Sequence, residues 1–178
     1  YEANSHRVGQ LSLPPRDAWS SRFWSPVCAA EHVAVRETAG VFDMTSLRRI
    51  MVTGPDAAAF LSAVAAKSVD RPVGSVTYTL LLDHTGGITS DVTISRLAED
   101  RFLVGGNGQR DTYWLQSHAG GYDVRVADIT EGTFSIAVWG PAAREILTPI
   151  ADADLGNDSF GYLTAREIGV AGVAATAV

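Results

Sequence analysis

The sequence is poor in cysteine, in lysine and in long apolar runs. Cys28 is the only cysteine among 178 residues, which excludes an internal disulfide and any metal cluster built from several cysteines. The most apolar run, Gly169–Val178, is much shorter than the roughly 20 residues that a membrane-spanning helix needs. The opening residues Tyr1–Gln10 are polar and do not resemble a signal peptide. We therefore expect a soluble, cytoplasmic protein with no membrane partner.

Positive charge is also scarce. The chain has 14 basic and 20 acidic residues, a net charge of -6, and no basic run. Such a surface repels a nucleic acid or an anionic membrane, so neither partner is expected. The four histidines are scattered without the spacing of metal ligands, so no metal site is expected either.

The composition itself is that of a folded globular protein. Hydrophobic residues make up 46% of the chain and charged residues 19%, enough for the core of one medium domain or two small lobes. The chain starts at Tyr1 rather than Met, and it ends inside a predicted strand. We expect it to be a piece of a longer polypeptide.

Short strands alternate with helices, which predicts an α+β fold. Residues 1–26 are rich in serine and proline and predict an irregular lead-in segment. The predicted helices cover 27–38, 56–66, 107–119 and 140–150. The predicted strands cover 47–53, 76–82, 88–97, 101–105, 122–128 and 134–139, and a hairpin closes the chain over 162–178.

A weak internal repeat is visible. Residues 52–57 are echoed by 138–143, and each copy reads as a strand, a Gly-Pro pair and the start of a helix. This pattern indicates two related β-α-β lobes, with the second beginning at about residue 129. The alternative is that strand-Gly-Pro-helix is simply a common junction, and both interpretations stay open.

Two stretches are candidates for chemistry. Residues 106–111 have the form of a dinucleotide fingerprint in which Asp111 replaces the third glycine, and a turn into a helix capped by Asn107 is the better interpretation. In the strand over 88–97, Thr89, Asp91, Thr93 and Ser95 alternate with Ile88, Val92 and Ile94. An aspartate in mid-strand is unusual. Asp91 faces either bulk solvent or a polar pocket.

Several stretches in unchanged order, from about Trp24 to Val178, resemble the glycine-cleavage T-protein (aminomethyltransferase) superfamily. They are 31–37, 40–47, 52–55, Phe60-Leu61, Tyr78-Thr79-Leu80, Gly86-Gly87-Ile88 with Asp91, Asp100-Arg101-Phe102 leading to Asn107, and 140–144. The resemblance is greatest to the folate-binding portion that follows the flavin domains of enzymes oxidising dimethylglycine and sarcosine.

This resemblance implies three lobes around a central hole that holds tetrahydrofolate. The first two lobes are α+β, and the third is a β-barrel that is missing here. Residues 27–178 are then a partial domain whose second lobe is truncated, and a segment supplying a folate-binding glutamate is expected after Val178.

The resemblance also implies an activity, namely tetrahydrofolate-dependent transfer of a one-carbon (methylene or aminomethyl) group from a small-molecule donor. The setting is demethylation or catabolism of the glycine-cleavage type. The implied partners are a lipoyl carrier protein or a flavin domain, separate or upstream, that binds FAD. Two other functions remain open: a non-catalytic, folate-binding regulatory relative, and a structural module that docks a flavin oxidoreductase domain.

The resemblance further implies which residues bind and react. Asp91 corresponds to the family's catalytic aspartate, and Asn107 to an asparagine that hydrogen-bonds the pterin. Leu47 and Tyr78 fall where pterin-packing side chains are expected, and Gly105 would allow the ring to approach closely. Leu47 and Tyr78 could equally belong to the core, Gly105 could be purely structural, and Asn107 could act only as a helix cap.

Overall fold

The computed structural model describes Ala18 and residues 25–178, so the predicted lead-in segment lies almost wholly outside the described residues. The described contacts group into two units. One unit contains the described residues up to Phe42 together with Ile136–Pro149, and the other contains Asp43–Ser135 and Ile150–Val178. The fold is α+β, as expected. A second lobe beginning near residue 129 stays a prediction.

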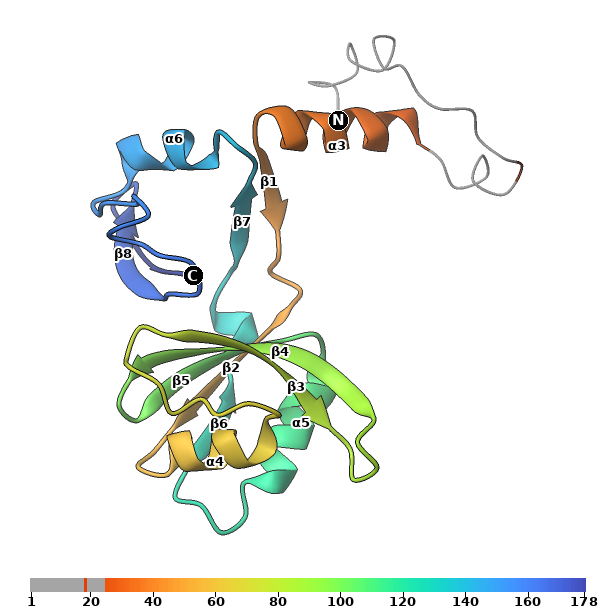
Figure 1. Ribbon diagram of the computed structural model, residues 1–178, viewed down its shortest axis with the longest axis vertical. Helices are drawn as coiled ribbons and strands as arrows, with labels where there is room; N and C mark the ends of the chain where they lie inside the picture. Colours follow the sequence, from red (N-terminus) through yellow and green to blue (C-terminus); the bar gives the residue numbers. More distant parts are fainter. Residues whose placement is uncertain (1–17, 19–24) are drawn as a thin grey trace. The chain divides into compact units, whose positions relative to one another are not determined.

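A five-stranded antiparallel sheet forms the centre of the larger unit (Figure 1). Its strand order is β3-β4-β5-β2-β6. The strands are β2 (Arg48–Thr53), β3 (Val76–Leu82), β4 (Ile88–Ala98), β5 (Arg101–Gly106) and β6 (Arg125–Asp128). Four of the predicted strands agree within about one residue, whereas β6 is shorter than the predicted strand over 122–128.

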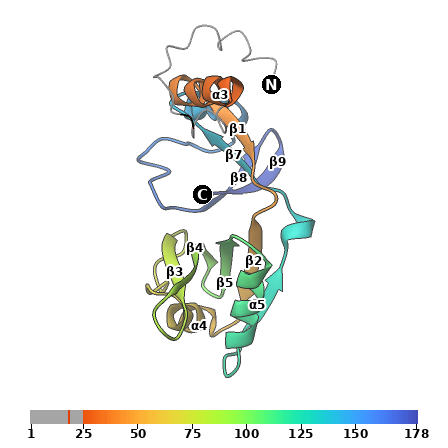
Figure 2. The ribbon, with the colours of Figure 1, turned by 90° about the vertical axis from the view of Figure 1, so that its right-hand side faces the viewer.

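Two helices, α4 (Ala57–Val64) and α5 (Gln109–His118), pack on one face of this sheet (Figures 1 and 2). Alternate strand residues and the apolar helix residues form one buried cluster that includes Ile50, Val52, Val92, Ile94, Phe102, Val104, Phe60, Leu61 and Leu115. Because strand side chains alternate between faces, the intervening residues of β3, β4 and β5 point to the opposite face. That opposite face bears the candidate site.

In the β3–β4 hairpin, the predicted alternation of apolar and polar residues along the strand 88–97 is partly wrong. Leu81 pairs with Ser90, but Leu82 pairs with Ile88, so the register shifts near the turn. As a result Ile88 leaves the core face and is 67% exposed. Ser95, expected beside Asp91 on the polar face, is buried.

The smaller unit pairs β1 (Gly40–Asp43) with β7 (Ile136–Trp139) and carries α3 (Pro26–Glu37) and α6 (Ala143–Leu147). The Ser25 hydroxyl caps α3 by accepting a hydrogen bond from the Cys28 N–H at 3.3 Å. The rings of Phe42 and Trp139 lie 4.8 Å apart across the β1–β7 pair. Strand β1 was not among the predicted strands. The predicted helix 140–150 is α6 followed by the 3-10 turn η3 (Thr148–Ile150).

The two copies of the internal repeat share a local geometry. Gly54 and Gly140 have φ angles of 135° and 125°. A Cβ on Gly54 would collide with the carbonyl oxygen of Asp123, and one on Gly140 with the carbonyl oxygen of Thr38. In both copies the N–H of the third residue after the glycine bonds back to the glycine carbonyl at 3.0 Å, which starts the helix. Only glycine fits either position.

The predicted closing hairpin is present as β8 (Arg166–Val170) and β9 (Val173–Ala177). Ala171 and Gly172 form its turn with φ angles of 51° and 79°. The remaining element is the 3-10 turn η2 (Thr130–Gly132), which follows β6. None of the helices in the described part of the chain combines the length and the apolar character that crossing a membrane requires.

Candidate functional site

Asp91 lies on β4, on the sheet face opposite the helices. Its sequence neighbours Ser90 and Val92 are buried, and the carboxylate itself is exposed. Leu80 pairs with Asp91 across β3 and β4, and Tyr78 pairs with Thr93, the next residue of β4 on the same face. This register brings the Tyr78 ring diagonally within reach of the Asp91 carboxylate.

Tyr78 and Asn107 both donate hydrogen bonds to the Asp91 carboxylate. The Tyr78 hydroxyl donates to Oδ2 at 2.9 Å, and Asn107 Nδ2 donates to Oδ1 at 3.1 Å. The Tyr78 bond, and then the Asn107 bond, lower the pKa of Asp91 below its ordinary value. The same carboxylate raises the pKa of Tyr78. Asp91 is therefore held as an anion and Tyr78 as a hydrogen-bond donor.

Asn107 follows β5 and turns its side chain toward β4. The prediction that it caps the next helix is wrong, because Gly108 occupies the N-cap position of α5. Asn107 Nδ2 instead donates to the backbone oxygen of Asp91 at 2.9 Å and to Ser90 Oγ at 3.2 Å, besides the carboxylate. Three of the predicted site residues are thus in one hydrogen-bonded group, defined here as the Tyr78–Asp91–Asn107 cluster.

Asp111 supports this cluster from inside the fold, and sequence reasoning missed it. It is only 5% exposed, and its Oδ2 accepts from the Asn107 N–H at 2.7 Å, the Gly108 N–H at 3.3 Å and the Ser90 hydroxyl at 3.0 Å. A carboxylate three residues after the N-cap is the recognisable signal for this arrangement.

Gly105 lies beside the cluster on the same face. It pairs with Thr93 on β4 and with Arg49 on β2. A Cβ at position 105 would lie 2.7 Å from Thr93 Oγ1, so the missing side chain leaves room for the Thr93 hydroxyl, two residues along β4 from Asp91.

Leu47 directly precedes β2 and is 37% exposed. Since Arg48 pairs with Gly106, continuing the register by one residue places Leu47 beside Asn107. Buried Arg49, which was not predicted, holds this segment. Its guanidinium donates to the carbonyl oxygens of Leu47 at 2.8 Å, Thr45 at 3.1 Å and Thr130 at 2.9 Å.

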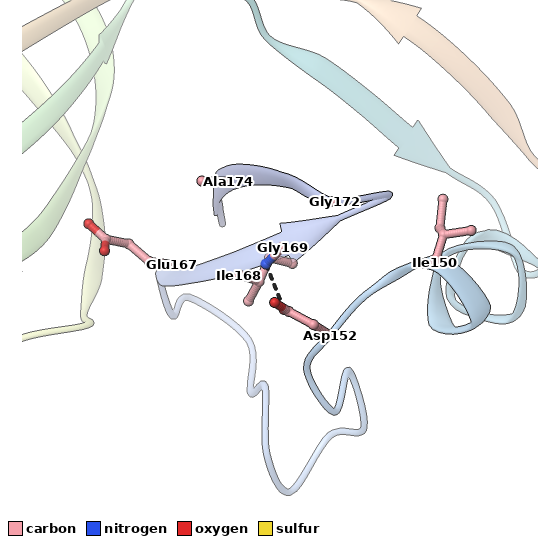
Figure 3. A pocket seen from close by; sticks show the side chains of 7 residues that line it. All are labelled: Ile150, Asp152, Glu167, Ile168, Gly169, Gly172 and Ala174. Atoms are coloured by element: carbon pink, nitrogen blue, oxygen red, sulfur yellow. Dashed lines mark hydrogen bonds between the residues drawn. The ribbon is translucent and has the colours of Figure 1, made fainter.

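Apart from this cluster, a depression lies along the β8–β9 hairpin (Figure 3). The Asp152 carboxylate lines it but accepts from the Gly169 N–H at 2.6 Å, so it fastens the hairpin. None of the predicted site residues lines this depression. In the described part of the chain, no group of three or more His, Cys, Asp or Glu side chains could hold a metal ion.

Comparison with known proteins identifies the same family along the whole chain. The family described as GCVT N-terminal domain matches residues 1–178. An aminomethyltransferase of Herpetosiphon aurantiacus is 36% identical over 148 residues, covering 80% of this chain and 41% of the relative. One from Moorella thermoacetica is 35% identical over 147 residues, covering 80% of this chain and 40% of the relative.

Solved structures agree. The glycine cleavage system aminomethyltransferase T from Bartonella henselae superposes with a TM-score of 0.69 and 30% identity, covering 77% of this chain and 38% of that one. The heterotetrameric sarcosine oxidase from Corynebacterium sp. U-96 superposes with a TM-score of 0.63 and 19% identity, covering 83% and 75%, which shows a shared fold alone. The chain spans about two fifths of the length of the curated relatives it matches.

Proposed function

Since the chain belongs to the family of the GCVT N-terminal domain, we propose that the protein transfers one-carbon groups to tetrahydrofolate. The observation that carries this proposal is the Tyr78–Asp91–Asn107 cluster, in which two side chains from neighbouring elements hold one exposed carboxylate.

The residues around the cluster suit a pterin ring. Gly105 adds no side chain to this face, and Thr93, which pairs with it, is small, so a planar ring can approach the sheet there. Tyr78, 48% exposed, and Leu47 offer apolar surface on which such a ring can pack. The Asn107 carboxamide and the Asp91 carboxylate supply the polar groups that fix its orientation. These features support tetrahydrofolate as the acceptor.

Tetrahydrofolate, when bound, supplies the nitrogen atoms that receive the one-carbon unit. Asp91 contributes a fixed negative charge beside nitrogens that become more positive during transfer. Its lowered pKa makes it a poor proton donor at neutral pH, so its role is electrostatic stabilisation and orientation of an N–H group. Tyr78 and Asn107 hold the carboxylate oxygens in place while this happens.

The donor proposed for the reaction is an aminomethyl group delivered by a lipoyl carrier protein. The support is that the relatives at 35–36% identity are named aminomethyltransferases. Demethylation beside a FAD-binding flavin domain is the other implied setting. The sarcosine oxidase neighbour shares the fold at 19% identity and does not favour that setting.

The decisive experiment replaces Asp91 with asparagine in the natural full-length protein. Asp91→Asn keeps the size of the side chain and removes its charge. We expect turnover with aminomethyl-loaded lipoyl carrier and tetrahydrofolate to fall about 100- to 1,000-fold, as for loss of one preorganised electrostatic group. Asp100→Asn, in the exposed β4–β5 turn, is the matched control and should keep wild-type turnover.

Titration of the wild-type protein with tetrahydrofolate separates the alternatives. Binding with turnover lost in Asp91→Asn supports the proposal. Binding without any turnover would instead identify a regulatory relative, and no binding would favour a module that docks a flavin domain. Wild-type turnover in Asp91→Asn would contradict the role given to this carboxylate.

A further inference from the structure

A chain of hydrogen bonds runs from the interior to the candidate site. It begins at Asp111, whose Oδ2 accepts from the Asn107 N–H and the Gly108 N–H at 2.7 and 3.3 Å. The same oxygen lies 3.0 Å from Ser90 Oγ. Both Asp111 and Ser90 are at least nine-tenths buried, so the surrounding fold restricts the motion of both side chains.

The direction of each bond in this chain is fixed by chemistry. The Ser90 hydroxyl has two acceptors in reach, Asp111 Oδ2 at 3.0 Å and the Asp91 backbone oxygen at 3.5 Å, and it donates its one hydrogen to the nearer, Asp111 Oδ2. Ser90 Oγ then offers only lone pairs to Asn107 Nδ2, which lies 3.2 Å away. The Asp91 backbone oxygen and Oδ1 also only accept, at 2.9 and 3.1 Å from the same nitrogen.

These directions fix the orientation of the Asn107 carboxamide. Its Nδ2 has two hydrogens, and three acceptors of Ser90 and Asp91 surround that nitrogen. A flipped amide would place Oδ1 against the same three oxygens, two of which have no hydrogen to donate. Asn107 Oδ1 is therefore directed away from β4, and no group among the described residues donates a hydrogen bond to it.

We propose that Ser90 and Asp111 are positioning residues that hold Asn107 Oδ1 as an acceptor for an N–H group of the bound ligand. This inference rests on the proposed function and adds to it. The site selects heterocycles whose edge carries an N–H or NH2 donor next to the group that contacts Asp91. A ligand with an acceptor there would meet only oxygen lone pairs, which a directional site rejects strongly.

The test measures the Kd for tetrahydrofolate in the natural full-length protein. Ser90→Ala removes the hydroxyl that links Asp111 to the amide, and we expect the Kd to rise about tenfold, as for the loss of one hydrogen bond. Ser90→Thr restores a hydroxyl at the same atom and should recover most of the affinity. Ser95→Ala, which removes another buried serine of β4, should leave the Kd unchanged.

A purely structural role predicts a different result. In that case Ser90→Ala would lower the free energy of unfolding while the folded protein bound tetrahydrofolate with the wild-type Kd, and this outcome would overturn the inference. Failure of the wild-type protein to bind tetrahydrofolate would overturn the proposed function itself. NMR of the Asn107 side-chain amide gives a second readout, since its two Nδ2 protons should exchange with water faster in Ser90→Ala than in the wild type. Unchanged exchange would also contradict the inference.

Discussion

Replacing Gly106 with alanine should destabilise the protein through one buried carboxylate. An added Cβ would stand 2.8 Å from Asp111 Oδ2 and 3.3 Å from Asp111 Cβ. Asp111 cannot retreat without weakening its bonds to the Asn107 and Gly108 N–H groups and to Ser90. Overpacking costs about 1–3 kcal/mol, and a weakened bond to a charged group costs up to about 1.5–3 kcal/mol. Alanine recovers about 0.5–1 kcal/mol of strand propensity, so the net loss is about 1.5–5.5 kcal/mol.

The assay is urea unfolding at equilibrium, with Gly108→Ala as the matched control. Gly108 has extended backbone with φ -164°, and nothing lies within 4 Å of a Cβ there. Replacing Gly108 with alanine stabilises the protein by about 0.4–1 kcal/mol because the unfolded chain has less conformational freedom, and this offsets a similar loss because alanine is a poorer N-cap residue than glycine. The free energy of unfolding of this control should therefore stay within about 0.5 kcal/mol of wild type. Equal losses in the two variants, or no loss in Gly106→Ala, would refute the reasoning.

Two further predictions concern the charge of Asp91 and the core. Tyr78→Phe removes the main cause of the lowered pKa of Asp91, so NMR titration of that carboxyl should give a higher pKa than in wild type. The pKa of Asp91 is lower in the folded protein than in the unfolded chain, so ionised Asp91 stabilises the fold at pH above its unfolded pKa, and this contribution is lost as pH falls through its folded pKa. In Tyr78→Phe the loss should occur at higher pH. An unchanged Asp91 pKa in the variant would contradict the assignment. Phe102→Ala should cost about 3–5 kcal/mol in urea unfolding because Phe102 is fully buried. Tyr113→Ala, at a site 72% exposed, should change the free energy by less than about 0.5 kcal/mol, and similar losses in both would contradict the assignment of the core.

The sequence was sufficient for the parts of the fold that depend on local patterns. The β3–β4 hairpin and the β8–β9 hairpin follow from apolar alternation around glycine-containing turns. The helix after Pro55 follows from the Gly-Pro pair and the apolar residues spaced along α4. Asp91 stood out because an aspartate is unfavourable in mid-strand, and the family resemblance supplied its expected partners.

Features that depend on distant contacts could not be read from the sequence. Asp111 looked like a defect in a glycine motif, and its role needs the turn that folds it against Ser90, 21 positions earlier. Asparagine is a residue type that commonly caps helices, but the Asn107 side chain donates to two oxygens of Asp91 instead. The bonds of Arg49 likewise reach Thr130, 81 positions away. Side chains with several donors find such partners only when the tertiary fold forms.

The register shift near the β3–β4 turn has a consequence for variation among related chains. Ordinarily one extra residue in a strand turns every later side chain to the wrong face. Here the irregularity lies between the turn and Asp91, while Thr79, Leu81, Val92 and Ile94 anchor the paired strands in the core. The segment 83–88 can therefore lengthen or shorten and leave the Asp91 carboxylate on its own side of the sheet.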